Sequence, residues 1–325
     1  MVFILLVSIA LAPGLYWRGE ATPRSHPQQL GVSDIAVPAD LRRLGDDPAA
    51  PVLDRAWQLS SDNELFSGFS ALVALDSAQF LAVTDGSHYV RWRLADGQLV
   101  LEGGRQLPAA AKDFKYARDI ESITRDPDTG QLWFGLEMRN AIRRTDADFD
   151  ALVQVSPEPM AIWPSNSGPE SLLRLSDGRF LTISEGARLS DTGGYAALQF
   201  GSDPIRNPPM TAFGIRPPDN YQVTDMAEIP DGRVLILLRR VKLNFPPRFQ
   251  SRILIADPAT IAEGENWQWE ELARLEDPRL PLDNFEGLAV TEGGDGKLYL
   301  WVISDDNAMK FQRTILLKIT WDPGD

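Results

Sequence analysis

Five segments of this 325-residue chain repeat one pattern, and this repetition constrains the fold more than any other feature. Each segment begins with an acidic or polar residue, continues as a short alternating apolar strand, turns tightly and ends in a second apolar strand. The segments are residues 70–85, 121–137, 170–185, 225–240 and 286–306. Their first residues lie 51, 49, 55 and 61 positions apart. Repeats of this length indicate an array of small sheets.

The turns within these segments also correspond. Four of them carry a residue followed by glycine between the two apolar strands, which predicts a hairpin because glycine adopts positive φ without strain. In the first segment Ser77 and Ala78 stand in this place, so we expect a different turn there. The four dipeptides are Thr129-Gly130, Asp177-Gly178, Asp231-Gly232 and Asp295-Gly296.

Further strand-like runs follow several segments, and long amphipathic helical patterns are nearly absent. Four antiparallel strands per repeat, arranged around a circle, make an all-β protein of the β-propeller type. The mean spacing of 54 residues divides the 274 residues from 52 to 325 about five times, so we expect five blades, with six as the alternative. The last repeat reaches its third strand at 314–321, and residues 54–60 are predicted to complete that blade and close the ring.

The N-terminal segment 1–17 has no charged side chain, and Arg18 is the first charged residue. Its apolar run of about 15 residues is shorter than the ~20 of a membrane span, which favours a signal peptide or a short membrane anchor. An N-terminal strand or core helix is the alternative. Residues 18–50 are predicted to form a linker and residues 51–325 the propeller domain. We therefore expect an exported, periplasmic protein, with membrane attachment through the N-terminus left open.

The charge balance and the rare residues exclude several classes of function. There are 46 acidic and 32 basic residues, a net charge of −14, which argues against nucleic-acid binding. The chain has no cysteine, which excludes disulfides and thiolate sites, and its two histidines are His26 and His88. Without a Gly-x-Ser-x-Gly motif, neither histidine predicts a Ser–His–acid triad.

The acidic first residues of the repeats should converge at one mouth of the central channel, because the first strand of a blade is the innermost. They are Glu121, Glu170, Asp225 and Glu286, with Ser70 in the fifth place. Gathered carboxylates repel one another, so they predict a divalent cation, with Ca²⁺ as the first candidate. The alternative is structural, with each carboxylate accepting backbone N–H groups from a neighbouring blade.

A second acidic set follows the second strands, and basic residues lie near the same mouth. Glu185 is the strongest candidate of this set for catalysis. A cation beside arginine suits an anionic ester, so we predict catalytic roles for Glu170, Glu185, Arg118 and Arg240. Two carboxylates acting as acid and base on a sugar are a further possibility. The remaining members of both sets are Asp85, Glu137, Asp305 and Asp306, with Lys112, Lys115, Arg139, Arg239 and Lys242.

Several motifs together resemble the bacterial phytase-like family, described as having esterase-like activity of phytase. They lie at residues 66–72, 83–85, 119–122, 168–171, 184–186, 284–287, 302–307 and 312–317. The resemblance implies an exported β-propeller and, more loosely, a hydrolase of phosphate or carboxylic esters. True β-propeller phytases are calcium-dependent and six-bladed, whereas five repeats are found here.

These observations predict a monomeric, metal-dependent hydrolase of a small anionic ester, with phosphate esters first. The rival is a non-catalytic propeller whose face serves as a binding platform and whose carboxylates are structural.

Overall fold

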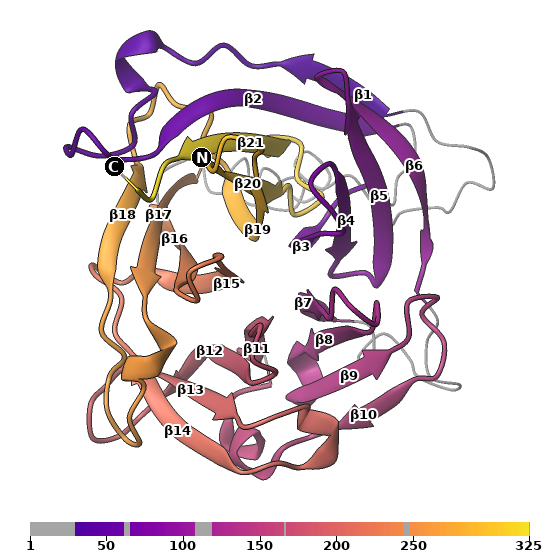
Figure 1. Ribbon diagram of the computed structural model, residues 1–325, viewed down its shortest axis with the longest axis vertical. Coiled ribbons are helices and arrows are strands. Elements are labelled where there is room, and N and C mark those ends of the chain that lie inside the picture. Colours follow the sequence, from indigo (N-terminus) through magenta and orange to yellow (C-terminus); the bar gives the residue numbers. More distant parts are fainter. Residues whose placement is uncertain (1–29, 62–65, 108–118, 166, 243–246, 325) are drawn as a thin grey trace, which may run out of the picture.

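The computed structural model describes residues 30–61, 66–107, 119–165, 167–242 and 247–324. Five antiparallel sheets surround a central axis as the blades of a propeller, with β3, β7, β11, β15 and β19 innermost (Figure 1). The prediction of an all-β, five-bladed propeller is confirmed, and the six-bladed alternative is wrong. Among the described residues the helices are short 3-10 turns, and none is long and apolar enough to cross a membrane.

The blades follow the chain in order. Blade 1 contains β3 (Phe69–Ala74), β4 (Gln79–Thr84), β5 (His88–Ala95) and β6 (Gln98–Gln106). Blade 2 contains β7 (Ile120–Arg125), β8 (Leu132–Leu136), β9 (Ala141–Thr145) and β10 (Val153–Val155). Blade 3 contains β11 (Pro169–Arg174), β12 (Phe180–Arg188), β13 (Tyr195–Phe200) and β14 (Met210–Ile215). Blade 4 contains β15 (Gln222–Glu228), β16 (Val234–Lys242), β17 (Arg248–Ala256) and β18 (Glu270–Leu275).

Blade 5 joins the two ends of the described chain. Its inner strands are β19 (Asn284–Glu292), β20 (Leu298–Asp305) and β21 (Thr314–Trp321), and its fourth strand is β2 (Val52–Ser61). The predicted closure by residues 54–60 is therefore confirmed. A fifth strand, β1 (Leu30–Asp34), pairs with the outer edge of β2. It lies in the described part of the stretch predicted as a linker, while segment 1–17 lies outside the described residues.

The 3-10 helices connect these strands. They are η1 (Ala39–Leu41), η3 (Glu137–Arg139), η4 (Glu158–Ile162), η5 (Pro204–Arg206) and η6 (Pro258–Thr260). The predicted glycine turns are present: Gly130, Gly178, Gly232 and Gly296 have φ of 73°, 89°, 87° and 79°. These left-handed values explain why glycine occupies the turns.

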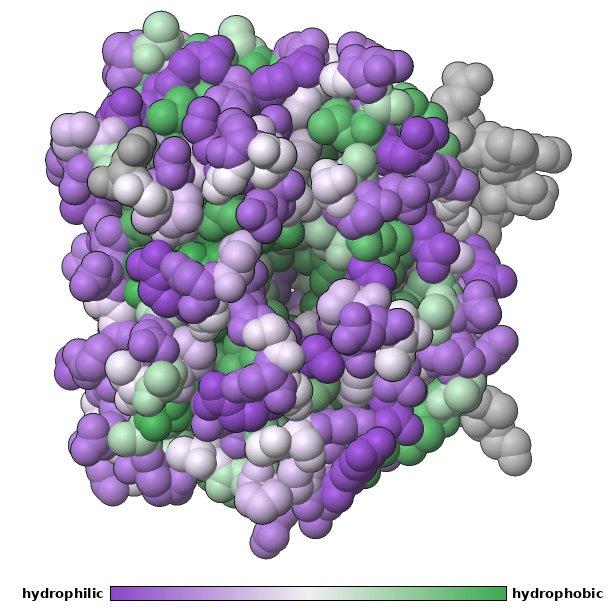
Figure 2. Space-filling model, in the orientation of Figure 1, coloured by the Kyte–Doolittle hydropathy of each residue, from purple (hydrophilic) through white to green (hydrophobic). Residues whose placement is uncertain are grey.

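The core consists of five apolar layers, one between each pair of neighbouring blades. Each strand contributes side chains to two of these layers, because successive side chains point to opposite faces of the sheet. On β20, Leu300 and Val302 pack toward blade 4, whereas Trp301 and Ile303 pack toward blade 1. This explains why the second strand of each repeat reads as a nearly continuous apolar run. The face of the propeller that is shown in Figure 2 is mostly hydrophilic, with hydrophobic residues around a central hollow.

Candidate metal centre

Each innermost strand carries a register irregularity near its start, and this irregularity positions the candidate site. Against the second strand of its blade, each first strand has one extra residue, a β-bulge. A bulge redirects the side chain that it inserts. In chain order the inserted residues are Ser70, Glu121, Glu170, Thr224 and Glu286. Three blades therefore present a glutamate at the same structural position.

Asp225 is not equivalent to these glutamates, because Thr224 occupies the bulge of blade 4. Its carboxylate accepts the backbone N–H of Met226 at 2.8 Å and that of Leu288 on β19 at 2.7 Å. Asp225 is 1% exposed. It therefore connects blade 4 to blade 5. This is the structural alternative given above, in which a carboxylate accepts backbone N–H groups from a neighbouring blade.

Thr224 and Ser70 also connect neighbouring blades. The Thr224 hydroxyl donates to the carbonyl oxygen of Phe285 at 3.3 Å, and Ser70 donates to that of Ile120 at 2.6 Å. In both cases the acceptor is the residue just before the glutamate of the next blade. These hydroxyls hold the neighbouring bulge in place.

A second ring of side chains stands beside the bulges, at the ends of the second strands. Register places Asp85, Glu137, Glu185, Arg239 and Asp305 at equivalent positions. Arg239 therefore holds the place for which the spacing of the repeats favours Arg240.

The carboxylates of blades 2 and 3 converge on one another. In the group of Asp119, Glu121 and Glu137, one oxygen from each lies within 4.8 Å of the others. The group of Glu137, Glu170 and Glu185 meets the same limit, so Glu137 belongs to both. Of the four predicted metal ligands, Glu121 and Glu170 lie in this cluster and Glu286 lies at its edge beside Arg239. We call these six residues the carboxylate cluster: Asp119, Glu121, Glu137, Glu170, Glu185 and Glu286.

Burial and mutual repulsion make the carboxylate cluster difficult to ionise completely. Burial, reinforced by the charge of Glu170, raises the pKa of Glu121 well above its usual value. Burial and the charge of Glu185 do the same to the pKa of Glu170. Burial raises the pKa of Glu137 to about 7, with Asp119 and Glu185 adding to the effect. Glu286 also has a pKa of about 7, since burial outweighs the favourable charge of Arg239.

Arg239 supplies the positive charge at this cluster. Its Nη1 donates to Glu286 Oε1 at 2.6 Å and its Nη2 donates to Glu185 Oε1 at 2.8 Å. Asn284 supports the arrangement, because its side-chain oxygen accepts from Arg239 at 2.8 Å and its Nδ2 donates to Glu286 at 2.7 Å. The surrounding carboxylates raise the pKa of the Arg239 guanidinium, although burial opposes this, so Arg239 stays charged.

Arg240, predicted as catalytic, points away from the cluster. Its guanidinium donates to Gln250 Oε1 at 2.7 Å and to the carbonyl oxygen of Asp219 at 3.2 Å. It also lies 4.5 Å from the ring centre of Tyr221. Neighbouring residues on a strand face opposite sides, which explains why Arg239 reaches the cluster and Arg240 does not.

Asp85, Asp305 and Asp306 lie at the junction of blades 5 and 1. Burial raises the pKa of Asp85 to about 6 and that of Asp305 well above its usual value. Asp306 accepts from the Ser67 hydroxyl at 2.6 Å and from the Gly68 N–H at 3.3 Å, so it joins the two blades. The predicted catalytic residue Arg118 lies outside the described residues, as do Lys112, Lys115 and His26.

The carboxylate cluster fits a hard divalent cation. Two oxygens on opposite sides of Ca²⁺, each at about 2.4 Å, are about 4.8 Å apart, so the observed spacing allows a shared ion. Glu170 is only 6% exposed, and its carboxylate has no hydrogen bond or ion pair among the described residues. A buried carboxylate without a partner is costly, and an all-oxygen donor set is the one that Ca²⁺ prefers.

The fold and the site together define a five-bladed β-propeller with an acidic cluster at one mouth. The family model Phytase-like, described as esterase-like activity of phytase, matches residues 64–308. The chain belongs to this family, as its motifs indicate. Among curated proteins no match is found.

Two solved structures match the chain at low sequence identity. A thermostable family-43 glycoside hydrolase matches with a TM-score of 0.50 and 9% identity, over 80% of this chain and 92% of that one. The WD40 β-propeller domain of Doa1 matches with a TM-score of 0.38 and 14% identity, over 87% of this chain and 97% of that one. At these identities the first likeness concerns the fold alone.

Proposed function

We propose that the protein is a metal-dependent hydrolase of small anionic esters, with phosphate esters as the first class. The observation that carries this proposal is Glu170, a buried carboxylate with no hydrogen bond or ion pair among the described residues. One of its oxygens lies within 4.8 Å of oxygens of Glu137 and Glu185, and it is near enough to Arg239 to feel that charge. Membership of the phytase-like family supports hydrolysis of an ester. The residues that would hold a divalent cation are Glu121, Glu137 and Glu170, with Asp119 and Glu185 beside them.

When bound, such a cation supplies Lewis acidity toward a phosphoryl or carbonyl oxygen. The residues of the chain supply orientation and charge. Arg239 holds Glu185 and Glu286 in fixed positions through two separate N–H groups, so a rearrangement of either carboxylate would break a charged hydrogen bond. Its guanidinium, which contacts the cluster through Glu185 and Glu286, could also attract an anionic group of the substrate. We assign to Arg239 the role predicted for Arg240.

The test combines metal analysis of the purified protein with a panel of phosphate and acyl esters. We expect a bound divalent cation, and hydrolysis that a chelator abolishes and Ca²⁺ restores. Glu170→Gln should lose both, whereas Glu292→Gln, a change at an exposed glutamate on β19, should lose neither. Cation binding without turnover of any ester would favour the rival proposal, a binding platform.

A further inference from the structure

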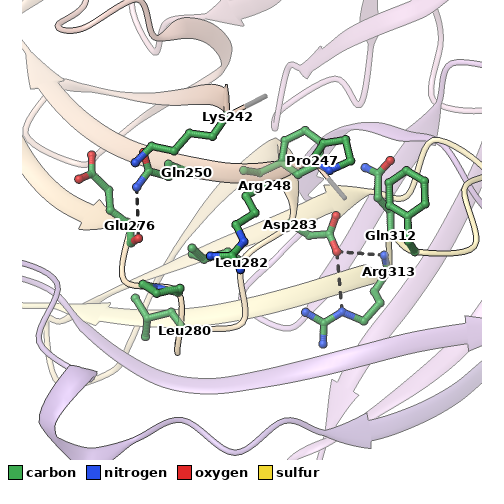
Figure 3. Close-up of a pocket in the computed structure, with 13 residues that line it drawn as sticks. Lys242, Pro247, Arg248, Gln250, Glu276, Leu280, Leu282, Asp283, Gln312 and Arg313 are labelled. Carbon is green, nitrogen blue, oxygen red and sulfur yellow. Dashed lines mark hydrogen bonds and ion pairs between the residues drawn. The ribbon is translucent and has the colours of Figure 1, made fainter. Parts of the chain in front are cut away.

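A cavity of about 430 Å³ lies between blades 4 and 5 (Figure 3). Its walls come from Lys242 at the end of β16, from residues 247–250 at the start of β17, from residues 276–283 and from residues 311–313. The volume falls in the range of small-molecule sites. Much of the lining is apolar or aromatic, and these residues are Pro247, Phe249, Pro278, Leu280, Leu282 and Phe311.

The charges of this cavity are unbalanced. Lys242 and Arg248 are directly opposite each other across the hairpin, both exposed. Neither side chain has a hydrogen bond or an ion pair among the described residues. Like charges placed opposite each other on a sheet repel, so this pair does not serve the stability of the hairpin.

The acidic residues of the walls are already occupied. Glu276 accepts from Arg252 Nε at 2.7 Å. Asp283 accepts the backbone N–H of Asn284 at 3.0 Å and that of Arg313 at 3.0 Å, and Figure 3 shows Arg313 beside it. An anion entering the cavity would therefore meet the free charges of Lys242 and Arg248.

The cavity lies near the carboxylate cluster but on the other face of β16. Lys242 lies three residues beyond Arg239 on β16, about 10 Å along the strand, and so shares the face of Arg240 rather than that of Arg239. Asp283 directly precedes Asn284, which bonds to Arg239. Gln312, another lining residue, donates from Nε2 to the carbonyl oxygen of Asp305 at 3.5 Å. The cavity is therefore a separate site, near the carboxylate cluster but distinct from it.

We infer that this cavity binds an organic anion, that is, an apolar or aromatic body carrying a phosphate or carboxylate group held by Lys242 and Arg248. The inference goes beyond the proposed function, because it names a second ligand site that does not depend on hydrolysis at the carboxylate cluster. The apolar walls contact the body, and the two cations hold the charged group at the rim.

Calorimetric titration of the full chain with phenyl phosphate, in the presence of a chelator, tests binding without catalysis. We expect phenyl phosphate to bind, and benzyl alcohol and inorganic phosphate to bind much more weakly. The double variant Lys242→Gln/Arg248→Gln should lose about tenfold or more in affinity, since charge-assisted hydrogen bonds are lost. The matched double variant Arg206→Gln/Arg216→Gln removes two exposed arginines elsewhere and should bind normally.

Phe311→Ala separates the two halves of the inference, because Phe311 is 37% exposed on the cavity wall and carries no charge. It should weaken phenyl phosphate binding and leave the weak phosphate binding unchanged. Equal affinity for phenyl phosphate in wild type and in the Lys242/Arg248 double variant would overturn the inference, and so would equal affinity for phenyl phosphate and inorganic phosphate. If binding occurs but the metal-loaded protein hydrolyses no ester, the cavity assignment stands and the proposed function fails.

Discussion

Arg239 on β16 donates to Glu185 on β12 over 2.8 Å, although the two residues belong to different blades. The same guanidinium reaches Glu286 on β19 at 2.6 Å. One side chain thus connects blades 3, 4 and 5 at the mouth of the ring. It also balances part of the negative charge that the bulges and strand ends bring together. Arg239 therefore stabilises the ring and positions the carboxylates of the proposed site.

The first prediction concerns Arg239 and its neighbour. Arg239→Gln should destabilise the protein by about 3–5 kcal/mol, because it leaves Glu185 and Glu286 without their buried partner. Ester hydrolysis should fall about 10²-fold or more through the loss of a positioned charge. Thermal unfolding and steady-state kinetics measure both effects.

Arg240→Gln, one residue along the same strand, is the matched control. It should keep activity, since Arg240 contacts Gln250 and Tyr221 rather than the carboxylate cluster. Arg239→Lys should also be less active than wild type, because a single ammonium group does not reproduce the guanidinium that donates to two carboxylates at once. If Arg240→Gln and Arg239→Gln lowered activity equally, the assignment of Arg239 would be wrong.

The second prediction concerns pH in the presence of a chelator. Glu137 and Glu286 have a pKa of about 7 and Asp85 a pKa of about 6 in the folded protein, all above the usual values. Between pH 5 and 8 the folded state therefore holds more protons than the unfolded state, and stability falls as pH rises. Denaturant midpoints at pH 5, 6.5 and 8 should decrease in that order.

Glu137→Gln provides the control for this pH effect. It removes one of the raised carboxyl groups, so the decrease from pH 5 to 8 should become shallower. Stability that increases over this range would show that the carboxylate cluster ionises without penalty, contrary to the burial of Glu170 and Glu286.

The third prediction concerns closure of the ring. Deleting residues 1–60 removes most of β2 and exposes the edge of β21, so we expect aggregation, measured by light scattering. Deleting residues 1–45 removes β1 and Leu44, which is 2% exposed in the layer between blades 4 and 5. That loss should cost about 2–5 kcal/mol, as for other buried leucines. A folded, monomeric product of the longer deletion would contradict closure by β2.

The fourth prediction separates structural from functional carboxylates. Asp225→Asn weakens the acceptor of the Met226 and Leu288 N–H groups, so the protein should lose stability to the same extent with and without Ca²⁺. Paired melting curves in Ca²⁺ and in chelator measure this. A calcium response that disappears in Asp225→Asn would instead place Asp225 among the ligands.

The fold was accessible from the sequence because its determinants are local and repeated. Apolar alternation marks each strand, and the glycine turns mark each hairpin. Closure by β2 followed from counting, since the last blade lacked one strand. β1 was not predicted, because residues 30–50 carry few large apolar side chains and the strand packs at the edge of a blade.

The sequence predicts the positions of the site residues only to within one residue. A β-bulge adds a residue without altering the apolar pattern visible in the sequence. The pattern therefore aligns Asp225 with the glutamates, whereas the structure places Thr224 at the equivalent position. On β16, Arg239 and Arg240 stand together and only the register distinguishes the faces that they occupy. The sequence marks Glu137 as the end of a strand, but its convergence with Asp119 depends on the three-dimensional path of blade 2.

The most direct test of the central claim is a calorimetric titration of Ca²⁺ into chelator-treated protein, with wild type, Glu170→Gln and Glu292→Gln side by side. A cation bound by the native state adds stability by mass action, so melting curves on the same samples provide a second measurement. We expect saturable binding and a raised melting temperature in wild type and Glu292→Gln, and loss of both in Glu170→Gln. Wild-type protein that neither binds Ca²⁺ nor changes its melting temperature in Ca²⁺ would contradict a metal centre at the carboxylate cluster.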